Sequence, residues 1–168
     1  TGSIAILGLQ ADAPDKFAFV VLDAVWPGTV INFTDIGWDD NTSTFTTFDE
    51  GVLTWTSPAN ILEPGTVVRI DGTTTASTGT VSETDAGFNL AAGGDQLLAY
   101  QASTSATTFL YAVSQDASGG WMTSGSPTDA SDSYLPPGLT LLVTEQSPSS
   151  HQENGYFTSA TLAGTRES

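Results

Sequence analysis

Hydrophobic and polar residues alternate in short runs along this chain, and turn residues separate the runs. Within Gly51–Thr56, Leu53 and Trp55 point to one face and the residues between them point to the other. No stretch of helical length carries an apolar stripe with the helical period, so the runs predict strands. The predicted strands are Ile4–Leu9, Phe17–Leu22, Val30–Thr34, Gly51–Thr56, Thr66–Ile70, Gln96–Gln101, Thr107–Val113, Leu139–Thr144 and Tyr156–Thr161.

The segments between these runs are rich in Gly, Ser, Thr, Asp and Pro, which favour turns and loops. The longest predicted loops are Asp35–Phe48, Thr73–Thr84 and Gln115–Ser133, and Thr73–Thr84 is of low complexity. Many short strands joined by such loops predict an all-β fold of two sheets packed face to face, a β-sandwich with long Gly/Ser/Thr-rich loops. We expect a single domain over residues 1–168.

Several motifs resemble the lamin-tail-like domain family, and they are most similar to its bacterial extracellular members. The motifs are Gly2–Ile6, Phe17–Val20, Ile31–Trp38, Glu50–Trp55, Leu62–Val68 and Leu90–Tyr100. The resemblance implies an immunoglobulin-like β-sandwich, usually non-catalytic, that serves as a structural or accessory module. The chain departs from the family in its inserts at Thr73–Thr84 and Ser114–Ser133. Relatives look as if they extend further at the C-terminus, which predicts an open sheet edge here.

Charge limits the partners of this chain. Three basic residues, Lys16, Arg69 and Arg166, stand against nineteen acidic ones, so the formal net charge is −16. Nucleic-acid binding needs a cationic stripe, and an anionic membrane surface would repel this chain, so we expect neither partner. No apolar run reaches the roughly 20 residues of a membrane span, so no membrane insertion is expected. Scarce Lys and abundant Ser and Thr favour a secreted, extracellular protein.

The sequence lacks the residues of common catalytic centres. It has no cysteine, and His151 is its only histidine. That histidine lies in a polar loop without a nucleophile motif, and zinc would find too few nitrogen and sulfur ligands. The acid pairs Asp39/Asp40 and Asp49/Glu50 are adjacent residues that point to opposite sides of a strand, so exposed loop charge is the simpler interpretation. We expect no enzymatic activity.

Calcium is the cation that these oxygen ligands suit best, because it binds carboxylates, amides and carbonyls. One candidate site is the set of Asp35, Asp39, Asp40 and Asn41 within one loop. Asp12 and Asp15 form a second acidic loop near the N-terminus. Neither loop has EF-hand spacing, and a solvated acidic surface without a bound ion is the alternative.

Tryptophan and asparagine residues suggest two contacts with glycans. Trp121 lies in a Gly-rich loop and is the candidate for stacking on a sugar, whereas Trp38 and Trp55 occupy positions that favour core packing. Asn32 and Asn41 each begin an N-x-[ST] tripeptide and are candidate glycosylation sites. Such tripeptides are also frequent by chance.

Two functions are therefore weighed. The first is a non-catalytic extracellular structural protein, a sandwich that self-assembles into a filament or surface layer through strand-edge or head-to-tail contacts between copies. The alternative is a calcium- or carbohydrate-binding accessory or adhesion module of a larger secreted protein. We prefer the structural function, because no residues suggest a dedicated ligand cleft.

Overall fold

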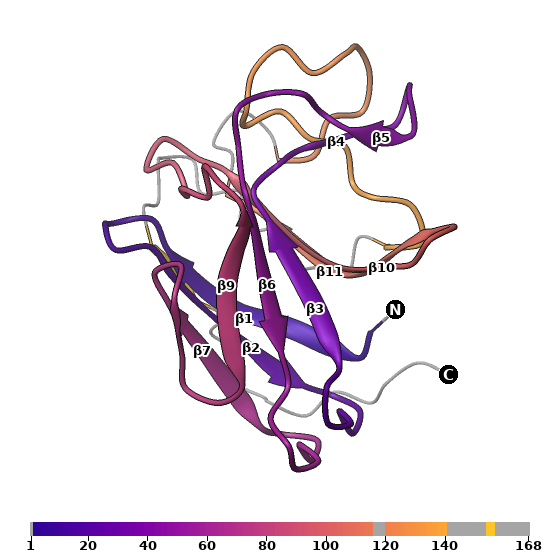
Figure 1. Ribbon diagram of the computed structural model, residues 1–168. Helices are drawn as coiled ribbons and strands as arrows, with labels where there is room; N and C mark the ends of the chain where they lie inside the picture. The colour runs from indigo at the N-terminus through magenta and orange to yellow at the C-terminus, as the bar shows by residue number, and fades with distance from the viewer. Residues whose placement is uncertain (1, 116–119, 141–153, 157–168) are drawn as a thin grey trace.

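The computed structural model describes residues 2–115, 120–140 and 154–156. Within these ranges the chain forms strands, turns and no helix, which confirms the all-β prediction. The described residues accordingly include no helix that is long and apolar enough to cross a membrane. Two antiparallel sheets pack against each other, and a small two-stranded sheet lies at one end (Figure 1). The chain is thus a β-sandwich of immunoglobulin-like character, as predicted.

Five strands form each main sheet. The first sheet has the order β12 (Asn154–Tyr156), β1 (Ile4–Gln10), β2 (Lys16–Val21), β7 (Val67–Asp71) and β8 (Thr75–Ala76). The second sheet has the order β11 (Thr107–Ser114), β10 (Gln96–Ala102), β3 (Val30–Thr34), β6 (Val52–Thr56) and β9 (Thr80–Asp85). The small sheet consists of β4 (Trp38–Asp39) and β5 (Thr44–Phe45).

Aromatic side chains fill the space between the two main sheets. The ring of Phe33 in β3 lies 4.8 Å from that of Phe17 and 5.1 Å from that of Phe19, both in β2. Trp55 in β6 meets Phe19 edge to face at 5.2 Å, and its Nε1 donates to the carbonyl of Thr78 at 2.9 Å. All four rings are buried, because alternate residues of each strand point inward. The predicted core positions of Trp38 and Trp55 are confirmed.

A second apolar cluster covers the outer face of β10 and β11. Its buried members are Trp38, Leu98, Tyr100 and Phe109. The β4–β5 hairpin and residues from 121 to 139 pack over them, so both faces of β10 are covered. Figure 1 shows this additional layer above the sandwich.

Two predicted loops contain strands. The segment Thr73–Thr84 contains β8 and most of β9. Val81 is the buried residue of β9, and it pairs with Trp55 of β6. Two apolar residues, Ala76 and Val81, among Thr, Ser, Gly and Glu leave little visible alternation. The segment Asp35–Phe48 contains the β4–β5 hairpin, whose Trp38 and Phe45 side chains pack in the second cluster.

The other strand predictions agree with the structure to within one or two residues at each end, up to Val113. Leu139 and Thr140 are not in a strand, and the rest of the predicted strand Leu139–Thr144 lies outside the described residues. The last predicted strand coincides with β12 only at Tyr156, and the remainder also lies outside them. In the predicted loop Gln115–Ser133, described residues 120–133 form no strand, apart from a single bridge between Met122 and Tyr134.

Candidate functional site

Asp35 is buried at the end of β3, where its carboxylate holds two neighbouring loops. Its Oδ1 accepts a hydrogen bond from the backbone N–H of Gly51 at 2.9 Å, and its Oδ2 accepts one from that of Asn89 at 2.7 Å. The residue has 0% of its surface exposed. A charged group is so buried only when such bonds replace its hydration. Asp35 therefore connects β3 to the turn before β6 and to the turn before β10.

Asp95 has a similar place at the start of β10. Its Oδ2 accepts from the N–H of Ala91 and its Oδ1 from that of Gln96, each at 2.8 Å. A third carboxylate, Asp15, accepts from the N–H of Leu90 at 2.8 Å and lies in the loop before β2. The segment between β9 and β10 is thus fixed by carboxylates from three parts of the chain.

Glu50 completes a cluster with Asp35 and Asp95. One carboxylate oxygen from each of the three residues lies within 4.8 Å of the others. Glu50 is half-buried, and its Oε2 is enclosed without a hydrogen-bond partner. Within the described chain this is the single group of three or more acidic, His or Cys side chains close enough to share an ion.

The cluster favours protonation. Burial, the hydrogen bond with Asp35 and the negative charges of Asp35, Asp95 and Asp49 together raise the pKa of Glu50 to about 9. Burial also raises the pKa of Asp95 to about 7, against the backbone N–H bonds that lower it. The pKa of Asp35 is raised as well, chiefly by burial. At neutral pH Glu50 therefore carries a proton that it shares with Asp35.

Among the described residues, no basic side chain forms an ion pair with these carboxylates. The ion pair of the described chain lies on the surface, where Lys16 Nζ is 3.2 Å from Asp71 Oδ2. The cluster can be neutralised by protons or by a hard cation, which prefers carboxylate oxygens. Asp95 retains lone pairs for this purpose, because each of its carboxylate oxygens accepts a single bond in the contacts described above.

The structure divides the first predicted calcium loop. Asp35 points toward Gly51 and Asn89, whereas Asp39 lies in the β4–β5 hairpin. There Asp39 Oδ1 accepts from the backbone N–H of Asn41 at 3.0 Å and from its side-chain amide at 2.9 Å. The Asp39 carboxylate thus stabilises a turn.

Asp40 and Asn41 are exposed in this hairpin, and the side-chain amide of Asn41 also donates to the carbonyl of Gly125 at 2.7 Å. In the second predicted loop Asp12 is exposed, while Asp15 borders the buried cluster. Of the six predicted ligands, Asp35 is therefore in the cluster and Asp15 lies beside it. The hydrogen bonds described above for the cluster do not include Asp12, Asp39, Asp40 or Asn41.

The remaining candidate residues, Trp121, Asn32 and Asn41, differ in how far they are exposed to solvent. Trp121 is half-buried against the second apolar cluster, so its ring is less open than expected for a stacking platform. Trp26 is the most exposed tryptophan, at 65%. Asn32 lies within β3 and its Oδ1 accepts from Thr54 Oγ1 at 2.8 Å, whereas Asn41 is at an exposed turn.

Sequence reasoning missed two members of the cluster. Glu50 was interpreted with Asp49 as exposed loop charge, which is correct for Asp49 only. Asp95 lies within the motif Leu90–Tyr100 and was not predicted to be a ligand. A signal was present, because Glu50 and Asp95 precede β6 and β10, the two strands that pair antiparallel with β3, so both lie at the end of β3 that Asp35 follows.

Comparison of the chain with protein-family models, with curated proteins and with solved structures finds no match.

Proposed function

We propose that this protein is a non-catalytic structural subunit of an extracellular assembly, a lamin-tail-like β-sandwich whose copies associate through strand edges. The observation that carries the proposal is the character of β11 at the edge of the second sheet. Its eight residues include no charged residue and no proline. Natural sandwiches usually protect such an edge with charge or proline, because its free backbone groups can pair with another chain.

The opposite edge of the same sheet differs. Strand β9 carries Glu83 and Asp85, and four of its six residues in succession are exposed and polar. Two negative charges per copy oppose pairing with a second acidic chain. Strand β11 pairs with β10, and the Gly2 N–H donates to the Leu110 carbonyl on its other side at 3.2 Å. The proposal therefore places the association at β11.

The N-terminal strand β1 stays within its own copy in this proposal. Ile4, Ile6 and Leu9 of β1 are buried in the chain's own core. A strand lent to a neighbouring copy would leave that core incomplete. Each copy therefore keeps β1, and the contact between copies uses edges that the folded sandwich presents.

The proposal is tested by adding lysines to the two edges separately. In one variant Thr107 and Thr108 of β11 become lysine, and in the matched control Thr80 and Ser82 of β9 do. All four side chains are exposed, so both variants should fold. Negative-stain microscopy and sedimentation should show assemblies for the natural protein and the β9 variant, and dispersed copies for the β11 variant. Natural protein that stays dispersed at all concentrations would refute the proposal.

The carboxylate cluster favours a second candidate function, a calcium-binding module. Its support is the enclosed, unpartnered Glu50 Oε2 beside Asp35 and Asp95. Calcium at a hundredfold excess over its dissociation constant would stabilise the fold by about 2.7 kcal/mol. Melting curves in calcium should then lie several degrees above those in chelator, and Glu50→Gln should abolish the difference.

Asp40→Asn is the matched control for this second candidate, because Asp40 belongs to the exposed hairpin that the sequence indicated. If calcium binds at the buried cluster, Asp40→Asn keeps the calcium-dependent rise in melting temperature. If Asp40→Asn alone removes that rise, the ion binds at the hairpin. Equal melting temperatures with calcium and with chelator would rule out both sites.

A further inference from the structure

We infer that the copies also meet head to side: the apolar end of one sandwich, centred on Trp26, docks in a groove on the first sheet of the next copy. This inference rests on the self-assembly proposed above and adds a second, more specific contact to it. The contact joins two different surfaces of the same chain, so it can repeat from copy to copy.

The apolar end gathers the large exposed hydrophobic residues of the described chain. These residues are Leu22, Trp26, Val30, Ile61 and Val67. They lie where β2 ends, where β3 and β7 begin, and in the turn between β6 and β7. The backbones of Val25 and Leu62 form two N–H···O hydrogen bonds, each 2.9 Å long. These bonds join the turn between β2 and β3 to the turn between β6 and β7 in one surface. Such a concentration of apolar side chains indicates an interaction site, whereas scattered ones do not.

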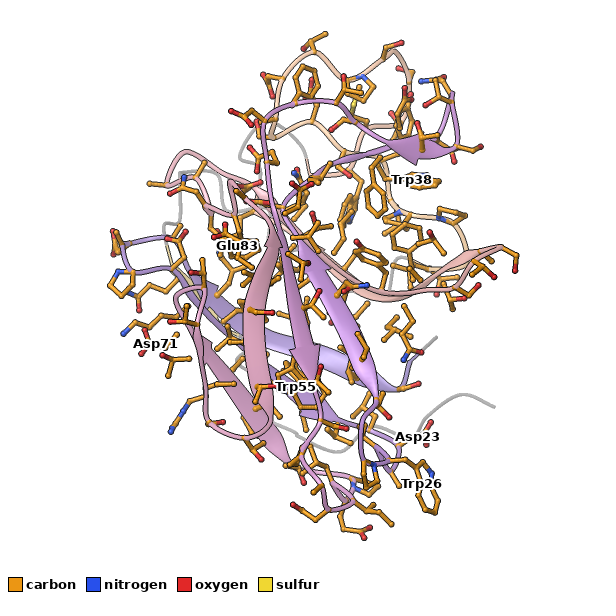
Figure 2. All side chains as sticks on the ribbon, viewed as in Figure 1. Asp23, Trp26, Trp38, Trp55, Asp71 and Glu83 are labelled. Atoms are coloured by element: carbon orange, nitrogen blue, oxygen red, sulfur yellow. The ribbon has the colours of Figure 1, made fainter. Side chains whose placement is uncertain are left out.

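Hydrogen bonds fix the backbone at Trp26, and its side chain is exposed to solvent. Its backbone carbonyl accepts bonds from Ser57 Oγ at 2.7 Å, Thr29 Oγ1 at 2.7 Å and the N–H of Thr29 at 3.1 Å. Figure 2 shows the side chain at the tip of the sandwich, directed away from the core. An exposed tryptophan on a hydrogen-bonded backbone can bury a large area on binding, which is typical of an anchor residue.

The groove lies across β1, β2, β7 and β8 on the outer face of the first sheet. Its volume is about 500 Å³. Leu7, Gly8 and Ala18 supply much of its apolar lining, and Lys16 and Arg69 also line it. The outer face of the second sheet contrasts with it, because Asn32, Thr54 and Thr84 make a polar, hydrogen-bonded row there. The first sheet thus offers an apolar hollow with two basic side chains, of which Lys16 pairs with Asp71 in the same lining and Arg69 is exposed.

Charge complementarity selects a second copy as the occupant. Lys16 and Arg69 are the basic residues of the described chain, and both are in the groove. An exposed acidic residue, Glu63, accompanies Trp26 at the apolar end. Elsewhere two copies with a net charge of −16 repel each other. An acidic apolar end against a basic apolar groove is the pairing in which both the charges and the surfaces match.

Cysteine cross-linking tests the contact, since the natural chain has no cysteine. Ala24→Cys marks the apolar end, Thr75→Cys marks the groove, and Thr84→Cys on the second sheet is the control; all three positions are exposed. Mixed Ala24→Cys and Thr75→Cys proteins should form a disulfide-linked pair under mild oxidation. Either variant alone, or Ala24→Cys with Thr84→Cys, should form at least tenfold less. Equal yields in all mixtures, or no mixed pair from assembled protein, would overturn the inference.

Substitutions at the contact give an independent measurement. Trp26→Ser and Arg69→Glu should each raise the concentration needed for assembly at least tenfold, whereas Glu63→Arg combined with Arg69→Glu should restore much of the loss. Circular dichroism and melting curves verify that each variant folds. If the natural protein assembles and Trp26→Ser assembles equally well, this inference fails and the strand-edge proposal stands. If the natural protein never assembles, both fail. A groove occupied by the chain's own residues would leave assembly insensitive to Arg69→Glu and would also overturn the inference.

Discussion

At the scale of single residues, the unusual feature of this molecule is a set of acids buried without a basic partner. Asp35 and Asp95 each accept two backbone N–H bonds, which compensate for lost hydration. Glu50 lacks such donors at Oε2 and keeps its proton instead. Removal of that proton places another negative charge beside Asp35, so the cluster is stable in its protonated form.

Glu50→Gln should therefore change how stability depends on pH. The pKa of Glu50 is about 9 in the folded protein, above its ordinary value, so the folded state binds more protons than the unfolded state between these values. The free energy of unfolding then falls as pH rises through this interval. Glutamine cannot ionise, so the variant should lose less stability. Urea unfolding at pH 6 and pH 9 should show a difference on the order of 1 kcal/mol, with allowance for partial exposure.

Asp40→Asn is the control for this comparison, because Asp40 is exposed in the β4–β5 hairpin and is not among the charges that raise the pKa of Glu50. It removes one charge of the same sign and should leave the pH dependence nearly as in the natural protein. A Glu50→Gln protein with the same slope as the natural protein would mean that Glu50 ionises normally in the folded state.

At the scale of elements, the turn between β8 and β9 shows how a glycine permits an edge strand to form. Gly79 has φ of +73°, and a Cβ there would lie 2.4 Å from the carbonyl oxygen of Thr56. The turn brings β9 beside β6, so that Val81 pairs with Trp55. The close approach of this turn to β6 therefore depends on the missing side chain.

Gly79→Ala should destabilise the fold by about 1–3 kcal/mol, because it combines an unfavourable φ with a steric clash. Gly93→Ala is the matched control, since a Cβ at Gly93 meets nothing within 4 Å and its φ is not in the left-handed region. Chemical denaturation of both variants measures the difference. Similar unfolding free energies for the two variants would show that the β8–β9 turn can move away from β6 at little cost.

Element patterns explain which parts of the structure the sequence predicts. Strands with clear alternation, such as β6, or with long apolar runs, such as β10, were predicted correctly. Strand β9 was missed because Val81 is its only buried residue. Of the carboxylate cluster, the sequence identified Asp35 as a candidate ligand, and Asp15, from the other candidate loop, lies beside the cluster. Its other members come from separate turns, and only the pairing of the strands brings them together.

At the scale of the whole molecule, the sandwich has two dissimilar ends. One end carries the carboxylate cluster and the added layer around Trp38, and the other carries Trp26 and its apolar neighbours (Figure 2). The described basic residues lie on the outer face of one sheet. An acidic chain with this distribution repels most approaches of a second copy and favours few orientations. Specific association is therefore compatible with high net charge.

The double covering of β10 also has a consequence for how the molecule opens. Strand β10 has a neighbour on each edge, the main core on one face and the second cluster on the other. Its amides can reach water only when all of these contacts separate together. The two-residue strand β8 pairs with β7 at the edge of the first sheet and can detach while the rest stays intact. Local unfolding is thus confined to the edges of the molecule, and the amides of β10 exchange with water only through global unfolding.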